Sequence, residues 1–311
     1  MRLQIVFAFM ILFVSQKSAF GWSESYYHII ASIAFRQLTP EKQSKLLKVL
    51  EGHPKYKTDF ALPPNLTNKQ AREWLVGRAS CWPEFDKSER DVMRYWEKEA
   101  VATIVLGNIT IEGRSETKTG EWQVAKKLEL CKQSMKDSSK NGSERALALC
   151  RIGYLVSNIH HPANAGSLFA ESVLPRGDAN GKLIPVKQNG GSLRTFWDEL
   201  LGEKFEALIT EKHLEEIQSS PELLFMAEAC YGYPPKQNPE DWLIESKFYA
   251  LSCMYTLEAY REVLLVMSTG EKEIVPVSLS EEYMASAKFA MQFRAKVAGL
   301  RLAAIWEEIL D

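Results

Sequence analysis

Histidine is scarce in this sequence of 311 residues, which has His28, His53, His160, His161 and His213 and no others. Imidazole is the commonest transition-metal ligand and a common general base, so an active site that needs many imidazoles would have to use every one of them. The five cysteines include no Cys-x-x-Cys pair, which argues against a thiolate zinc site. In an exported chain they permit up to two disulfide bonds, whose pairing the spacing leaves open.

The sequence also lacks a surplus of basic residues. Its 38 Lys and Arg are offset by 40 Asp and Glu, giving a formal net charge of −2. Proteins bind phosphate backbones mainly through clustered Lys and Arg, so this balance does not indicate a broad nucleic-acid surface. A metal site would supply a positive field locally without such a cluster.

Long hydrophobic runs are missing as well. The run at residues 5–14 has ten apolar residues, whereas a membrane-spanning helix needs about 20. Arg2 before this run and the small-residue site Ala19-Phe20-Gly21 after it are typical of a secretory signal peptide. We therefore expect residues 1–21 to be removed. Residues 22–311 would then form one exported domain, secreted or periplasmic, with no stable membrane anchor.

Apolar residues recur at helical spacing along most of residues 22–311, which predicts an all-α fold in a single domain. Two helices are expected to open it, the second starting at Thr39-Pro40 with a threonine cap and a proline in the first turn. Further helices are predicted over residues 69–77, 120–136, 143–158, 193–201, 203–211, 221–230, 241–266 and 280–309. Short strands are expected at 101–106 and 183–186, and a long loop at 175–191.

Several segments, in order along the chain, resemble the S1/P1 nuclease family. The opening Trp22-Ser-Glu-Ser-Tyr-Tyr-His-Ile-Ile-Ala-Ser-Ile-Ala is similar to the family's Trp-Gly-x-x-Gly-His-x-x-Val-Ala-x-Ile-Ala. Residues 79–84 resemble its Ala-x-Trp-Pro-Asp segment, and residues 192–198 its Asn-Leu-His-x-x-Trp-Asp segment. Residues 145–164 are similar to its Leu-x-x-Leu-x-His-x-x-Gly-Asp-x-x-Gln-Pro-Leu-His helix, and residues 242–246 and 298–303 match its C-terminal helices.

This resemblance implies a mainly helical fold, shared with zinc-dependent phospholipase C. It also implies a cleft with three zinc ions, held by the N-terminal tryptophan, five histidines and three aspartates. In the family these ions activate a water and neutralise the phosphate under attack. The substrates that the resemblance implies are single-stranded nucleic acid and 3′-nucleotides.

Most of the implied zinc ligands are replaced in this sequence. Trp22 and Asp198 match the family, and Glu84 replaces an aspartate. The remaining positions are occupied by Tyr27, Arg94, Tyr154, Asn158, Asn164 and Arg194. Phenols, amides and guanidinium groups are not zinc ligands, so we expect no cofactor here, or at most a reduced zinc site.

Nearby histidines are candidates for alternative ligands. His28 follows Tyr27 directly, and one step along an α-helix turns a side chain by about 100°, so we expect it to point away from the site. His160 and His161 stand just before Pro162, where a helix is expected to end. They either reach the cleft or pack beside that helix end, and packing is favoured.

The substituted positions form a pattern of their own. Arg94 and Arg194 bring permanent cations close to the carboxylates of Glu84 and Asp198. Since an arginine can satisfy a buried carboxylate with two hydrogen bonds, we predict that a network fills the old zinc cleft, joined by Tyr27, Tyr154 and Asn158. A variant of this hypothesis is that the arginines bind phosphate or another anion in the cleft.

Three functions follow from these residues. The favoured one is an exported S1/P1 nuclease-like protein whose catalysis is impaired or lost. The alternative is an active endonuclease or 3′-nucleotidase with an altered zinc site built from Trp22, Glu84, Asp198 and His160 or His161. A third is metal-independent hydrolysis, with Arg94 or Arg194 binding phosphate and His160 as the base.

Overall fold

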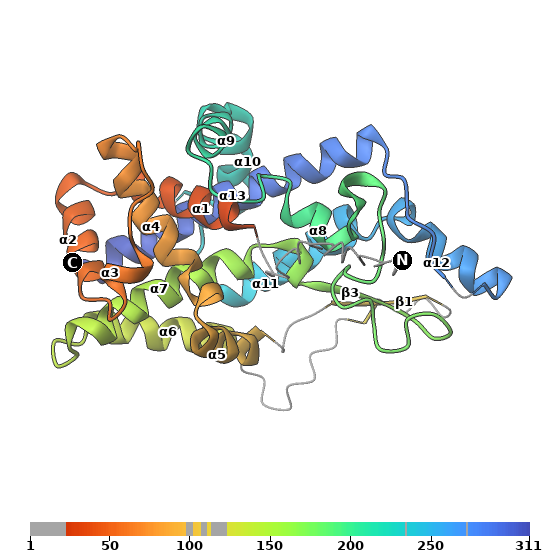
Figure 1. Cartoon of the computed structure of the whole chain (residues 1–311), viewed down its shortest axis with the longest axis horizontal. Helices are drawn as coiled ribbons and strands as arrows, with labels where there is room; N and C mark the ends of the chain where they lie inside the picture. The colour runs from red at the N-terminus through yellow and green to blue at the C-terminus, as the bar shows by residue number, and fades with distance from the viewer. Residues whose placement is uncertain (1–22, 98–101, 107–110, 113–122, 234, 272) are drawn as a thin grey trace, which may run out of the picture.

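The computed structural model describes residues 23–311 except 98–101, 107–110, 113–122, 234 and 272. The predicted signal peptide and Trp22 lie outside these residues. Figure 1 shows a bundle of helices with a small sheet at one end, which confirms the all-α fold class. The helices are α1 (Glu24–Gln37), α2 (Pro40–Glu51), α3 (Tyr56–Asp59), α4 (Asn68–Phe85), α5 (Lys87–Glu97), α6 (Gln123–Lys136), α7 (Gly142–Ile159), α8 (Leu193–Asp198), α9 (Ala207–Ser219), α10 (Pro221–Tyr231), α11 (Pro239–Tyr249), α12 (Leu257–Thr269) and α13 (Glu281–Ile309).

Helix α1 lies at the centre of the bundle. Every residue from Ser25 to Phe35 is buried, because α1 packs against α4, α7, α9 and α13. A helix enclosed on all sides must be apolar or small nearly all round, as this one is. The long helix α13 crosses it closely at Gly299, where a Cβ atom would lie 2.5 Å from Cγ2 of Ile33 (Figure 1).

Helix α4 is longer than the predicted 69–77. It starts with a capping box between Thr67 and Gln70 and continues past Gly77 to Phe85. The helix continues through Gly77, whose missing side chain leaves room for the imidazole of His28: a Cβ atom there would lie 2.0 Å from Nδ1 of His28.

Three other helix predictions needed correction, and α3 and α5 were not predicted. The helix predicted at 193–201 ends at Asp198, and the one predicted at 203–211 runs from Ala207 to Ser219. The helix predicted at 241–266 is interrupted by a π-helical turn, η3 (Ala250–Met254), after which α12 starts at Leu257. Tyr255 leaves the helical conformation there, and its hydroxyl donates to the carbonyl oxygen of Gly166 at 3.3 Å. A tertiary contact therefore overrides the local helical pattern.

The small sheet has the order β2-β1-β3. Strand β1 (Ala102–Leu106) pairs in antiparallel fashion with β2 (Ile111–Glu112) and in parallel with β3 (Gly166–Ala170), with Ala102 opposite Gly166. The strand predicted at 101–106 is therefore present. The segment predicted as a strand at 183–186 forms isolated bridges instead, Pro185 with Ser192 and Val186 with Val277.

The C-terminus lies beside α2 at one end of the bundle (Figure 1). There the Lys42 ammonium is 2.6 Å from Oδ1 of Asp311. Over the described ranges, no helix combines the length and apolar character needed to cross a bilayer.

Candidate functional site

The side chains at seven of the nine candidate ligand positions form a buried polar cluster between α1, α4, α7 and α8. They are Tyr27, Glu84, Tyr154, Asn158, Asn164, Arg194 and Asp198. Of the other two positions, Trp22 lies outside the described residues. Arg94 lies on α5, but its side chain is outside them.

Two tyrosines form one side of the polar cluster. The rings of Tyr27 and Tyr154 are stacked, with centroids 5.7 Å apart and planes 10° apart. Tyr154 donates its hydroxyl hydrogen to Oε2 of Glu84 at 3.0 Å, and Tyr27 donates to Oδ1 of Asn158 at 3.2 Å. Helix geometry brings Tyr154 and Asn158 to the same face of α7, because they are four residues apart. The phenols thus connect the Glu84 carboxylate with the amide of Asn158.

Two asparagines continue the polar cluster toward α8. Asn164 lies in the short helix η1 (Pro162–Asn164) and donates from Nδ2 to Oδ1 of Asn158 at 3.2 Å. Its own Oδ1 accepts from Nη2 of Arg194 at 2.9 Å. The Asn158 oxygen therefore accepts from both Tyr27 and Asn164, as a carbonyl with two lone pairs can.

Arg194 and Asp198 form an ion pair one helical turn apart on α8. Nε of Arg194 donates to Asp198 at 2.9 Å, and Nη1 donates to the carbonyl oxygen of Ala163 at 2.9 Å. Both side chains are buried, and burial raises the pKa of Asp198 to about 6 although the Arg194 charge opposes this rise. Together with Nη2, all three nitrogens of the guanidinium hydrogen-bond within the protein.

His161 lies beside this ion pair. Its Nδ1 accepts from the backbone N–H of Ala163 at 3.1 Å, which places the proton of the neutral ring on Nε2. Nε2 is 3.5 Å from Oδ1 of Asp198. Burial and the Arg194 charge hold the pKa of His161 well below its usual range, so the imidazole is neutral.

The loop predicted at 175–191 positions α8. The backbone N–H of Arg194 donates to the carbonyl oxygen of Gly181 at 3.2 Å, and Ser192 caps α8 through Thr195. Gly181 has φ +87°, a conformation that favours glycine, and a Cβ atom there would lie 3.1 Å from the nitrogen of Arg194. The role of Gly181 was not predicted, and the only sequence sign of it was the Asn-Gly pair at a turn.

His160 points away from the polar cluster. Its Nδ1 is 2.7 Å from the carbonyl oxygen of Val156, and its Nε2 is 2.8 Å from Nη1 of Arg301. Arg301 and Arg294 both hold Glu245, with nitrogen-to-oxygen distances of 2.7 Å. With both ring nitrogens engaged inside the core, His160 is placed for packing and not for general base catalysis.

His28 also lies outside the polar cluster. It faces α4, where its ring centroid is 6.3 Å from that of Trp74, and it also lies 4.5 Å from the ring centroid of Phe205, whereas Tyr27 faces α7. The 100° step along α1 thus separates the two side chains as expected. His53 packs against Trp82, with ring centroids 4.2 Å apart, and His213 lies 3.6 Å from Glu216 on α9. The five histidines have different neighbours and do not surround a common site.

The sequence model of the S1/P1 Nuclease family matches residues 22–311, nearly the whole chain. The chain belongs to the S1/P1 nuclease family. A search among curated proteins gave no match. Family membership supports a nuclease-like hydrolase, and the polar cluster contains seven of the nine positions at which the sequence resemblance implies the family's zinc ligands.

The polar cluster does not fit the zinc ions of S1/P1 nucleases. Of its two carboxylates, Glu84 accepts a hydrogen bond from Tyr154, and Asp198 forms an ion pair with Arg194. A guanidinium cannot coordinate a metal, and its permanent charge repels one. The phenols and amides that complete the cluster are poor zinc ligands. His161, with its Nε2 toward Asp198, is the one imidazole that the described residues bring to this place.

Proposed function

We propose that this S1/P1 family member is an exported protein that has lost the zinc-dependent hydrolysis of the family. In this proposal the former metal cleft has become a structural polar cluster, and the protein acts through binding or another non-hydrolytic role. For the export signal and for Trp22, this proposal rests on the sequence alone.

The contacts of Arg194 are the main support for this proposal. Its guanidinium hydrogen-bonds to Asp198 and Asn164. In this proposal all three residues stand at former zinc-ligand positions. A buried carboxylate needs a compensating cation, and here that cation is part of the chain itself. Arg194 thus supplies, within the chain, much of the positive charge that a metal ion would otherwise bring to Asp198, although Oδ1 of Asp198 has no hydrogen-bond partner among the described residues.

The same contacts argue against an anion in the cleft. Each nitrogen of Arg194 already donates to a protein oxygen, so an incoming phosphate would have to displace Asp198, Asn164 or the carbonyl of Ala163. Metal-independent hydrolysis is disfavoured as well, because the proposed base His160 has Nε2 beside Arg301.

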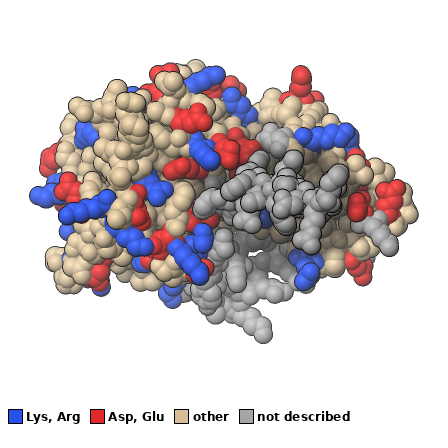
Figure 2. Space-filling model, in the orientation of Figure 1, with Lys and Arg blue, Asp and Glu red and all other residues tan. Residues whose placement is uncertain are grey.

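On the face in view, the described residues show no concentrated basic surface that would support nucleic-acid binding. Figure 2 shows Lys and Arg interspersed with Asp and Glu over the face in view. This agrees with the balanced composition of 38 basic and 40 acidic residues. Affinity for a nucleic-acid backbone would normally come from a concentrated basic surface.

The test is a cleavage assay on single-stranded DNA, RNA and 3′-nucleotides with added zinc, using the chain that starts at Trp22. We expect no turnover above buffer and no difference between the wild-type chain and Asp198→Ala. Zinc-dependent turnover that Asp198→Ala abolishes would overturn the proposal and favour the alternative, a reduced zinc site at Asp198 and His161.

A reversion variant provides the positive control. It restores the family ligands by six substitutions: Tyr27→His, Arg94→His, Tyr154→His, Asn158→Asp, Asn164→His and Arg194→His. If ligand loss explains the missing activity, this variant should bind additional zinc and gain turnover, with folding checked by circular dichroism. The wild-type assay alone decides the proposal if the variant does not fold.

A further inference from the structure

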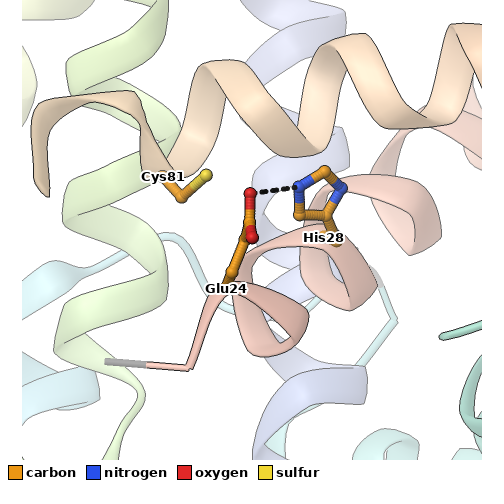
Figure 3. A group of neighbouring side chains, drawn as sticks. All are labelled: Glu24, His28 and Cys81. Atoms are coloured by element: carbon orange, nitrogen blue, oxygen red, sulfur yellow. Dashed lines mark ion pairs between the residues drawn. The ribbon is translucent and has the colours of Figure 1, made fainter. Parts of the chain in front are cut away.

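A second group of side chains lies on the other side of α1. Glu24 and His28 are one turn apart on α1, and Cys81 faces them from α4 (Figure 3). One ligand atom from each, a carboxylate oxygen, an imidazole nitrogen and the thiol sulfur, lies within 4.8 Å of the others. Nε2 of His28 is 3.7 Å from Oε1 of Glu24. In a tetrahedral zinc site, ligand atoms are about 3.5 Å apart, so small side-chain movements would complete the geometry.

The imidazole of His28 is the observation that points to a ligand. The side chain is completely buried, yet neither Nδ1 nor Nε2 has a hydrogen-bond partner. A buried polar atom without a partner costs about 1–3 kcal/mol, so native proteins rarely keep two on one ring. Burial lowers the pKa of His28, which keeps a nitrogen lone pair available for coordination.

We propose that Glu24, His28 and Cys81 bind one divalent transition-metal ion of the zinc type and thereby connect α1 to α4. Nitrogen, sulfur and carboxylate oxygen together suit zinc or cobalt better than magnesium or calcium. The site has three protein ligands, which leaves one position of a tetrahedral ion for water or another ligand. It differs from the family's zinc positions, since Tyr27 occupies the matching place on α1.

Binding would exchange a proton for the metal. Burial raises the pKa of the Cys81 thiol, so the sulfur carries its proton until the metal arrives. The sulfur–hydrogen bond then breaks, a sulfur–metal bond forms, and the proton leaves to solvent. The thiolate and the Glu24 carboxylate together balance the two positive charges of the ion.

The surroundings allow this exchange. Arg78 lies 3.7 Å from Oε1 of Glu24, beyond hydrogen-bond distance, and is held separately by Phe85 and by the carbonyl oxygen of Asp59. Its positive charge still opposes a cation at this place, so the thiolate and the Glu24 carboxylate have to outweigh it. All five cysteines are free thiols, so Cys81 is not committed to a disulfide. Because Gly77 has no side chain, the imidazole of His28 fits beside it.

The test is a cobalt titration of the chelator-treated chain that starts at Trp22, kept reduced. We expect one Co²⁺ per chain with a sulfur-to-cobalt charge-transfer band in the near ultraviolet, displaced by Zn²⁺. The band should vanish in Cys81→Ala and persist in Cys131→Ala, which removes another buried thiol outside the group. Absence of the band in the wild-type chain, or its persistence in Cys81→Ala, would overturn the proposal.

Glu24→Gln decides the question if Cys81→Ala does not fold, because Glu24 is partly exposed and the amide has nearly the same shape as the carboxylate. Its affinity for Co²⁺ should fall at least about tenfold, and unchanged affinity would contradict the site. Asp198→Ala separates this proposal from the proposed function. If Asp198→Ala loses the metal and Cys81→Ala keeps it, both the new site and the proposed loss of the family's zinc site are refuted. If only the Cys81 and Glu24 variants lose the metal, the result supports both proposals.

Discussion

Arg194 lies at a position where the family resemblance implies a zinc ligand, and it brings a permanent positive charge there instead. Its three nitrogens reach Asp198, Asn164 and the carbonyl oxygen of Ala163. An ammonium group has no planar fork and cannot make the same set of contacts, so Arg194→Lys is not a conservative change here.

Removing this guanidinium should destabilise the fold strongly. We expect Arg194→Ala to lower the free energy of unfolding by about 3–5 kcal/mol, because it leaves Asp198 buried without its cation. Urea denaturation measures this. The exposed Arg261→Ala, as a control, should change stability by less than about 0.5 kcal/mol.

A double-mutant cycle identifies the cause of that loss. If the stranded charge dominates, Arg194→Ala combined with Asp198→Asn should be clearly more stable than Arg194→Ala alone. Strict additivity of the two substitutions would show that the Arg194 contacts with Asn164 and Ala163, and not the ion pair, carry the effect.

At the level of elements, the crossing of α1 and α13 depends on the missing side chain of Gly299. A Cβ atom there would lie 2.5 Å from Cγ2 and 2.6 Å from Cβ of Ile33, and 3.2 Å from the carbonyl oxygen of Ile30. Both helices are buried at this point, so neither can move without disturbing other contacts.

Gly299→Ala should therefore destabilise the protein by about 1–3 kcal/mol through overpacking, despite the better helix propensity of alanine. Gly142→Ala is a matched control, because its Cβ atom would meet only the Cα of Gly52 at 3.8 Å. That control should be neutral or stabilising by up to about 1 kcal/mol. Thermal unfolding compares the two variants, and equal melting temperatures would contradict the crossing argument.

The elements also show how far sequence reasoning extends. Periodicity and caps predicted most helices, because amphipathic spacing and side-chain capping are local properties. The break at Tyr255 was missed because it involves a partner distant in the chain, Gly166. The contact of Gly77 with His28 was missed for the same reason. Strand β3 was missed because its pairing partner β1 precedes it by more than 60 residues.

The sequence predicted which residues meet at the candidate site but not the contacts between them. Resemblance to the family indicated the candidate ligand positions, and helix spacing predicted that Tyr154 and Asn158 share a face. The stacking of Tyr27 on Tyr154 and the reach of Arg194 to Ala163 depend on how α1, α7 and α8 pack. The partnerless imidazole of His28 likewise became visible only in three dimensions.

For the whole molecule, all five histidines change the pH dependence of stability in the same direction. Burial lowers the pKa of each one in the folded state, that of His53 to about 4. As pH falls below about 6.5, the unfolded chain therefore binds protons that the folded chain does not. Asp198 opposes this trend, because its raised pKa of about 6 gives the folded state an extra proton.

We therefore expect the free energy of unfolding to fall between pH 7 and pH 5, by at most about 1.4 kcal/mol per pH unit for each histidine. Urea denaturation across this range measures the slope. In His53→Asn the amide oxygen can still accept from the backbone N–H of Lys55, but the titrating group is gone, so the slope should decrease. A pH-independent stability would contradict the burial of the histidines.

The enclosure of α1 limits how a histidine could come to replace Tyr27. The imidazole of His28 is one residue further along α1, and deleting one residue before it would bring it to the place of Tyr27, which faces α7. The same deletion would rotate every following side chain as far as Phe35, all of them buried, into places shaped for other residues. Point substitution at Tyr27 is consequently the accessible evolutionary route, and insertions or deletions in this helix should be purged by selection.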